Sequence, residues 1–261
     1  MLKSKKIKFL KISSELGAGT RGASKGFEGL KSAAEAAGSK LFSDYEIISI
    51  KDENNSLLKN INFPSAKRIQ SIYEVLNRVK KTVNDEVKQN HFPLLISGDH
   101  SISMGTISGI KSAFPNKKIG VIWIDAHADI HTPFTTPSGN MHGMPIAASL
   151  GLDNFSCASN TPKKEVIELW NNIKILGGNT PNLEPKNIVY VGVRDTEWEE
   201  DKLITKLGIH KYSVDFIRRN RGIKSAETIL KKLENVDLIY ISFDVDVLDN
   251  SLSTGTGTPV P

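Results

Sequence analysis

Apolar residues in this chain follow two alternating patterns. Short continuous runs rich in β-branched residues predict buried strands, and longer stretches between them have helical periodicity. The predicted strands cover residues 7–12, 46–50, 93–97, 119–125, 188–193, 209–213 and 238–244, and the predicted helices cover 66–90, 104–114, 163–174, 198–207 and 224–234. This alternation predicts an α/β fold with three layers, in which helices flank a parallel sheet. The absence of any internal repeat favours one domain over residues 1–261.

Acidic residues and histidines stand at the ends of two predicted strands. Asp125, His127 and Asp129 follow the apolar run 119–124, and Asp244 and Asp246 follow the run 238–243. Because alternate residues of a strand share a face, we expect each group to point one way. Gathered carboxylates would raise one another's pKa, and a bound cation is the simplest way to keep them ionised. The pattern therefore predicts a metal site.

A third strand end adds another candidate ligand. The run 93–97 leads through Gly98 into Asp99 and His100, with Ser101 placed to begin a helix. Oxygen donors in the majority, two imidazoles and no thiolate argue against structural zinc and favour manganese. Two ions about 3.5–4 Å apart could share bridging carboxylates and a bridging water. The six candidate ligands are His100, Asp125, His127, Asp129, Asp244 and Asp246.

Two long loops flank these groups. Residues 14–26 are rich in glycine and lack the spacing of a Walker motif, so we predict a rim of the substrate cleft and no phosphate loop. Residues 131–145 follow the first acidic string. They should lie beyond the carboxyl ends of the strands, where α/β sheets bind ligands.

Composition narrows the class of protein. Hydrophobic residues make up 39% of the chain and charged residues 24%, as in ordinary globular proteins. The net charge of +5 is scattered, which argues against nucleic-acid binding. Cys157 is the single cysteine and is expected to be a passive thiol. No apolar run suits a signal peptide or a membrane span, so we expect a cytoplasmic protein without membrane contacts.

Four motifs together resemble the ureohydrolases, and the arginases most closely. They occur in the family's order and read 97–101 (SGDHS), 125–133 (DAHADIHTP), 138–145 (SGNMHGMP) and 242–249 (SFDVDVLD). The resemblance implies an arginase/deacetylase-like α/β fold and a centre of two Mn²⁺ ions. It also implies hydrolysis of the guanidinium group of L-arginine to L-ornithine and urea, and a homo-oligomer, either a trimer or a hexamer.

The resemblance also implies roles for individual residues. One ion would be held by His100, Asp125, Asp129 and Asp244, and the other by His127, Asp125, Asp244 and Asp246. His142 resembles the family's proton shuttle, and Asp129 is the second residue to which the resemblance gives a catalytic role. The implied substrate contacts are His131, Ser138, Asn140, Glu197 and Thr258.

Several positions depart from the family's pattern. His131 stands where arginases usually have Asn, Glu197 where many have Asp, and Val247 where a glycine is usual. The sequence ends at Pro261, before the family's strand that carries a glutamate facing the guanidinium. We therefore expect a domain that lacks its C-terminal part and is nearly inactive as it stands.

Three functions remain open at the level of the sequence. The first is an arginase, and the second is an agmatinase or another guanidino-acid ureohydrolase. The motif 138–142 favours arginase, because agmatine has no carboxylate for it to hold. The third is a truncated relative that binds metal without turnover.

Overall fold

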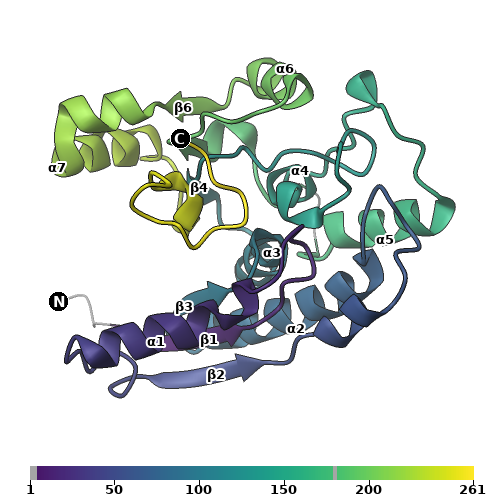
Figure 1. Cartoon of the computed structure of the whole chain (residues 1–261). Coiled ribbons are helices and arrows are strands. Elements are labelled where there is room, and N and C mark those ends of the chain that lie inside the picture. Colours follow the sequence, from purple (N-terminus) through teal and green to yellow (C-terminus); the bar gives the residue numbers. More distant parts are fainter. Residues whose placement is uncertain (1–4, 179–180) are drawn as a thin grey trace.

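The computed structural model describes residues 5–178 and 181–261 and has the predicted alternation of strands and helices (Figure 1). The strands are β1 (Ile7–Ile12), β2 (Glu46–Ile50), β3 (Phe92–Ser97), β4 (Ile119–Ile124), β5 (Ile188–Val191), β6 (His210–Tyr212) and β7 (Leu238–Phe243). The helices are α1 (Gly26–Ala36), α2 (Ile69–Lys88), α3 (Ser103–Ala113), α4 (Pro145–Ser149), α5 (Lys164–Lys174), α6 (Trp198–Leu207) and α7 (Val214–Lys232).

All strand pairs in the described residues are parallel, which confirms the predicted sheet type. The strands form two sheets, with the orders β2-β1-β3 and β6-β5-β4-β7. In the second sheet β4 is central, with β5 on one side and β7 on the other. This order places the acidic groups that follow β4 and β7 next to each other, although more than 100 residues separate them in the sequence.

Three helices differ from the prediction, and one of them, the five-residue helix α4, was not predicted. Helix α1 was not predicted; it begins at the end of the glycine-rich stretch and buries only Phe27. Helix α7 begins at Val214, well before the predicted residue 224, because the Ser213 hydroxyl accepts a hydrogen bond from the Phe216 amide at 3.1 Å. Its early part is largely polar and is interrupted at Arg221, whose φ of 60° breaks the helix.

The two sheets share one hydrophobic core on one face. Helices α2, α3 and α5 pack there, and side chains such as Leu10 of β1, Leu76 of α2 and Trp123 of β4 belong to a single buried cluster. On the opposite face α1 and α7 cover separate clusters, one around Phe9 and the other around Ile122. Figure 1 shows α1 and α7 apart on this face. The helices of the shared core therefore hold the two sheets together.

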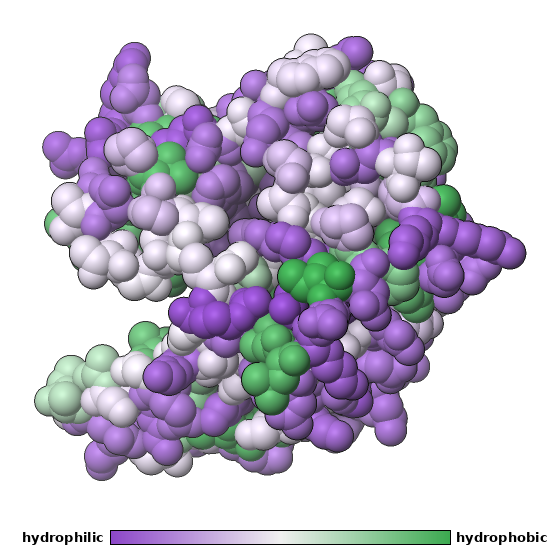
Figure 2. Space-filling model, turned by 45° about the vertical axis from the view of Figure 1, so that its right-hand side comes forward, coloured by the Kyte–Doolittle hydropathy of each residue, from purple (hydrophilic) through white to green (hydrophobic). Residues whose placement is uncertain are grey.

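Strands β3 and β7 are edge strands of their respective sheets. On β7, Ile239, Ile241 and Phe243 point away from the shared core and are 41%, 60% and 56% exposed. Figure 2 shows the surface hollowed between the upper and lower halves of the molecule. The two edges are joined through side chains, because His100 Nε2 lies 2.6 Å from Ser242 Oγ.

Among the described residues, no helix has both the length and the apolar character needed to cross a bilayer.

Candidate metal centre

The first acidic string lies beyond its strand, which corrects the geometry expected from alternation. Strand β4 ends at Ile124, and residues 125–129 form a loop in which Asp129 has a φ of 50°. The Asp125 Oδ1 atom accepts the His127 amide proton at 2.7 Å, a local turn that folds the string back on itself. The three side chains converge through this turn, not through the pleat of a strand.

The second string has the same construction. Asp244 caps a short 3₁₀ turn, Val245–Val247, by accepting from the Asp246 amide at 3.1 Å. A further hydrogen bond joins the two strings, since the Ala126 amide donates to Asp246 Oδ1 at 3.2 Å. The ends of two neighbouring strands are thus fastened together at the centre.

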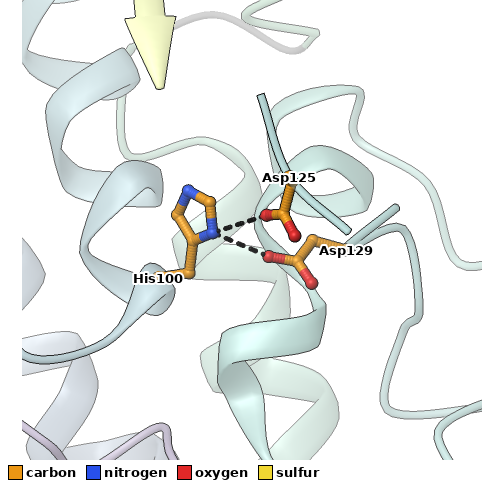
Figure 3. A group of neighbouring side chains, drawn as sticks. All are labelled: His100, Asp125 and Asp129. Atoms are coloured by element: carbon orange, nitrogen blue, oxygen red, sulfur yellow. Dashed lines mark ion pairs between the residues drawn. The ribbon is translucent and has the colours of Figure 1, made fainter. Parts of the chain in front are cut away.

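His100 reaches the cluster from the turn that follows β3. Its ring stacks on Trp123 with centroids 4.1 Å apart and planes at 9°. Its Nδ1 lies 2.9 Å from Asp125 Oδ2 and 3.1 Å from both Asp129 Oδ2 and Asp244 Oδ2. Figure 3 shows the first two of these carboxylates turned toward the imidazole. Four of the six predicted ligands therefore meet around one point.

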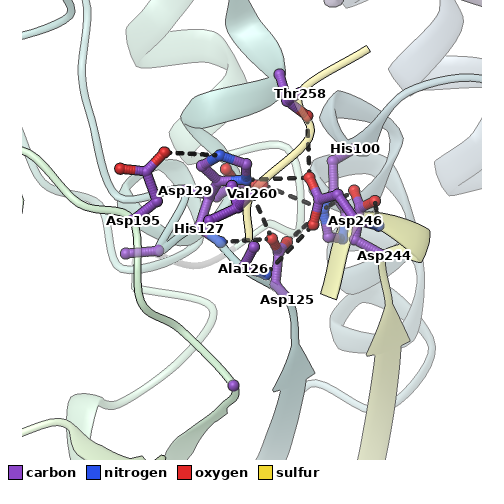
Figure 4. Close-up of polar contacts among 12 residues, drawn as sticks. His100, Asp125, Ala126, His127, Asp129, Asp195, Asp244, Asp246, Thr258 and Val260 are labelled. Carbon is purple, nitrogen blue, oxygen red and sulfur yellow. Dashed lines mark hydrogen bonds and ion pairs between the residues drawn. The ribbon is translucent and has the colours of Figure 1, made fainter. Parts of the chain in front are cut away.

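His127 belongs to a second group that shares Asp125. Its Nδ1 lies 3.0 Å from Asp246 Oδ2 and 3.5 Å from Asp125 Oδ1 (Figure 4). Asp125 therefore turns one oxygen toward each histidine, as a carboxylate that bridges two cations would. Asp195, which the sequence analysis missed, lies 3.6 Å from His127 Nε2.

The pKa shifts of the clustered side chains show that positive charge stabilises this site. Burial lowers the pKa of His127, but Asp125 and Asp246 outweigh burial and raise it to about 11. Burial together with the Asp125 charge raises the pKa of Asp129 to about 7. The neighbouring imidazoles outweigh burial at Asp125 and lower the pKa of its carboxyl. Protonated imidazoles therefore supply the charge that bound cations would supply.

The donor set fits divalent ions. His100 Nδ1 and Asp125 Oδ2 are buried and neither forms a hydrogen bond among the described residues, although they approach to 2.9 Å. Buried polar atoms left in this state are costly, and a shared cation would satisfy both. Carboxylates and imidazoles with no thiolate suit manganese better than a structural zinc site.

His142 lies in a separate 3₁₀ turn, Met141–Gly143, whose His142 amide donates to Gly17 O at 3.2 Å. Burial lowers the pKa of the His142 imidazole. The contact with Gly17 joins the two long loops predicted to border the cleft.

His131 and Glu197 are in contact, as two members of a separate polar group. Glu197 caps α6, and His131 Nε2 lies 3.1 Å from Glu197 Oε2 while its Nδ1 lies 3.0 Å from Thr135 Oγ1. The group also contains the buried Glu200, whose pKa is raised well above its usual range by burial and by Glu197. Glu200 was not predicted from the sequence; in the structure Glu197 and Glu200 form the two reciprocal hydrogen bonds of a capping box at the start of α6.

The other predicted substrate contacts lie in two places. The Asn140 side-chain oxygen Oδ1 accepts a hydrogen bond from Lys67 Nζ at 3.1 Å, and the Asn140 backbone amide donates to the Ser138 hydroxyl at 3.2 Å. Thr258 lies at the metal cluster itself, where its hydroxyl donates to Asp246 Oδ2 at 3.0 Å (Figure 4). Thr258 therefore contacts a candidate metal ligand directly.

Fold and site together define a parallel α/β protein with a candidate metal centre at the carboxyl ends of its strands. A sequence model described as the Arginase family matches residues 5–261, and the chain belongs to that family.

Individual relatives agree with this assignment. The chain is 35% identical to the arginase of Bacillus subtilis over 210 residues, which cover 80% of this chain and 62% of that protein. It is 36% identical to the arginase of Bacillus caldovelox over 197 residues, covering 74% and 59%. The chain thus matches about three fifths of the length of these relatives.

Solved structures show the same fold. The arginase of Entamoeba histolytica, solved in complex with L-ornithine, aligns with a TM-score of 0.79 at 28% identity and covers 98% of this chain and 80% of its own. The arginase of Bacillus caldovelox aligns with a TM-score of 0.78 at 30% identity and covers 98% and 81%. The predicted arginase-like α/β fold is therefore confirmed.

Proposed function

We propose that this protein is a hydrolase that uses two Mn²⁺ ions to cleave the guanidinium group of L-arginine into L-ornithine and urea. The observation that carries the proposal is the buried cluster in which Asp125 turns one carboxylate oxygen toward His100 and the other toward His127. Family membership supports the same reaction class.

Different residues of the protein would hold the two ions and the substrate. Asp129 would complete the ligands around His100 and Asp246 those around His127, with Asp125 and Asp244 shared between the two ions. When bound, the ions would supply Lewis acidity that polarises the guanidinium and acidifies water. Glu197, at the start of α6, offers a negative charge to the substrate's ammonium group.

His142 is proposed to move a proton to the departing amine. Because burial lowers its pKa, the imidazole is neutral near pH 7 and able to take up and pass on a proton. If His142 serves this role without binding metal, His142→Ala in a full-length enzyme should keep both ions and lose about 10²–10⁴-fold in turnover. Metal analysis beside the kinetics checks this, and the loss of one ion equivalent would contradict the role.

A second substrate class is favoured by one specific contact. His131 Nδ1 lies 3.0 Å from Thr135 Oγ1, and its Nε2 lies 3.1 Å from Glu197 Oε2. Both ring nitrogens of His131 are then engaged, and neither is free to hold a substrate carboxylate. A guanidino compound with a distal ammonium and no carboxylate, such as agmatine, is therefore the second candidate.

Urea release distinguishes the candidates. A full-length enzyme loaded with Mn²⁺ is given L-arginine and agmatine in parallel, with Asp125→Ala as the matched inactive control. Faster release from arginine supports the first proposal, and faster release from agmatine supports the second. Two bound ions with no release from either substrate would favour the non-catalytic metal-binding relative instead. The expected homo-oligomer, with trimer or hexamer as its size, stays a prediction that sedimentation of the same sample tests.

A further inference from the structure

Arg194 lies in the loop between β5 and α6 and reaches across to the last residues of the chain. Its backbone amide donates to Ala126 O at 2.9 Å, which fastens the loop to the first acidic string. Its guanidinium donates to Val260 O at 3.0 Å and to Pro261 O at 2.8 Å. The same group donates to Gly192 O and Asp246 O at 3.2 and 3.4 Å. One side chain thus gathers four backbone carbonyls from three segments.

The segment held by Arg194 is packed on both sides. Val260 is buried. A Cβ built on Gly257 would lie 1.9 Å from Thr20 Oγ1, so the segment also lies closely against the loop that follows β1. Figure 4 shows Thr258 and Val260 from this segment beside the carboxylates of the cluster.

Thr258 is the point at which this segment touches the candidate ligands. Asp246 Oδ2 receives the Thr258 hydroxyl proton at 3.0 Å and faces His127 Nδ1 at 3.0 Å, while Oδ1 receives the Ala126 amide. Asp246 is only 3% exposed, so water cannot replace the Thr258 hydroxyl as a hydrogen-bond donor to it unless the surrounding residues rearrange.

We infer that Arg194 is a positioning residue that, by holding residues 258–261, places the Thr258 hydroxyl on Asp246 and so orients one ligand of the second ion. This inference rests on the proposed metal centre. Hydrogen bonds to metal-binding carboxylates fix their orientation, and the loss of such a partner typically costs 10–100-fold in metal affinity. The effect should fall on the His127–Asp246 side and spare the His100 side.

The test measures Mn²⁺ binding by equilibrium dialysis on the whole chain, with turnover not required. Thr258→Val, which removes the hydroxyl and keeps the shape, should weaken one of two ions about 10–100-fold. Thr258→Ser should restore near-normal affinity. Because Trp123 stacks on His100, quenching of tryptophan fluorescence by the remaining ion should persist in Thr258→Val.

Arg194→Gln should reproduce the loss seen with Thr258→Val, and the double variant should lose no more than either single one, since both act through one contact. Arg219→Gln, which removes an exposed guanidinium paired with Asp215, is the matched control and should bind as the parent does. If Arg194→Gln does not fold by circular dichroism, Arg194→Lys replaces it, because an ammonium keeps the charge without the planar fork.

Additive losses in the double variant, or unchanged binding in Thr258→Val, would overturn the inference while leaving the metal centre intact. A parent protein that binds no Mn²⁺ would instead overturn the metal centre and the inference with it.

Discussion

At the scale of single residues, the chemistry of the centre follows from charge crowding. Asp125, Asp129 and Asp246 are buried together, and only positive charge from imidazoles or bound cations keeps such a group ionised. Both halves of the cluster depend on Asp125, whose two carboxylate oxygens face His100 and His127.

Replacing Asp125 should therefore cost both ions, whereas replacing a ligand on one side should cost mainly one. We expect Asp125→Ala to retain no manganese after dialysis, and His100→Ala to keep one equivalent and lose the other. Metal analysis of the dialysed proteins measures this. Two ions retained by Asp125→Ala would show that the six residues are not the ligands.

The affinity for manganese should rise with pH. Ions must displace the protons of His100, whose pKa is raised well above its usual range, of His127, whose pKa is raised to about 11, and of Asp129, whose pKa is raised to about 7. Below pH 7 all three protons compete with the ions, and above it only the two imidazole protons do. Each displaced proton changes the affinity for manganese by about tenfold per pH unit, so the rise of affinity with pH should become less steep above pH 7. Titrations between pH 6 and 8 measure this, and a flat profile would contradict the assignment.

At the scale of elements, the position of His100 depends on how α3 packs against α2. Gly105 and Gly109 of α3 face α2 so closely that an added Cβ would lie 2.9 Å from Leu76 O and 2.8 Å from Lys80 O. These two glycines bring the helix axes together, and His100 stands just before the start of α3. The packing of α3 against α2 thus determines how deeply the candidate ligand His100 lies in the metal centre.

Gly109→Ala should destabilise the protein by about 1–3 kcal/mol despite alanine's better helix propensity, because the methyl group has no space. The matched control is Gly29→Ala in α1, where nothing lies within 4 Å of the added Cβ. That variant should gain up to about 1 kcal/mol. Urea denaturation measures the free energy of unfolding of both variants, and equal changes would show that the close approach of α3 to α2 does not affect stability.

At the scale of the whole molecule, the outstanding feature is the division into two sheets that share one core. Strands β3 and β7 each end their sheet, and β7 presents a row of exposed apolar side chains. Unprotected edges of this kind pair with other chains and promote association. We therefore expect the exposed edge of β7 to promote association between copies of the protein.

Ile241→Lys should reduce association, because a charged side chain on an edge strand opposes pairing. Leu58→Lys is the control, since Leu58 is 90% exposed and lies on a 3₁₀ turn away from β7. Light scattering against protein concentration should show less association for Ile241→Lys and no change for Leu58→Lys. The same result for both variants would mean that the β7 edge has no special part.

Much of this architecture follows from local pattern. The stripe of Ile69, Ile72 and Val79 predicts α2, and the apolar runs before Asp125 and Asp244 predict β4 and β7, because periodicity is set by neighbours in the sequence. The donor types and their spacing predicted a metal centre, and three of the other five candidates lie within 3.1 Å of His100 Nδ1.

Tertiary structure alone decided the rest. It placed β7 beside β4, turned Asp125 and Asp129 through a loop instead of a strand, and joined His131 to Glu197 across 66 residues. It also brought Arg194 onto the segment that carries Thr258. The physical reason is that hydrophobic periodicity encodes which residues face a core, whereas contacts between distant segments depend on strand order and on the packing of all the elements together.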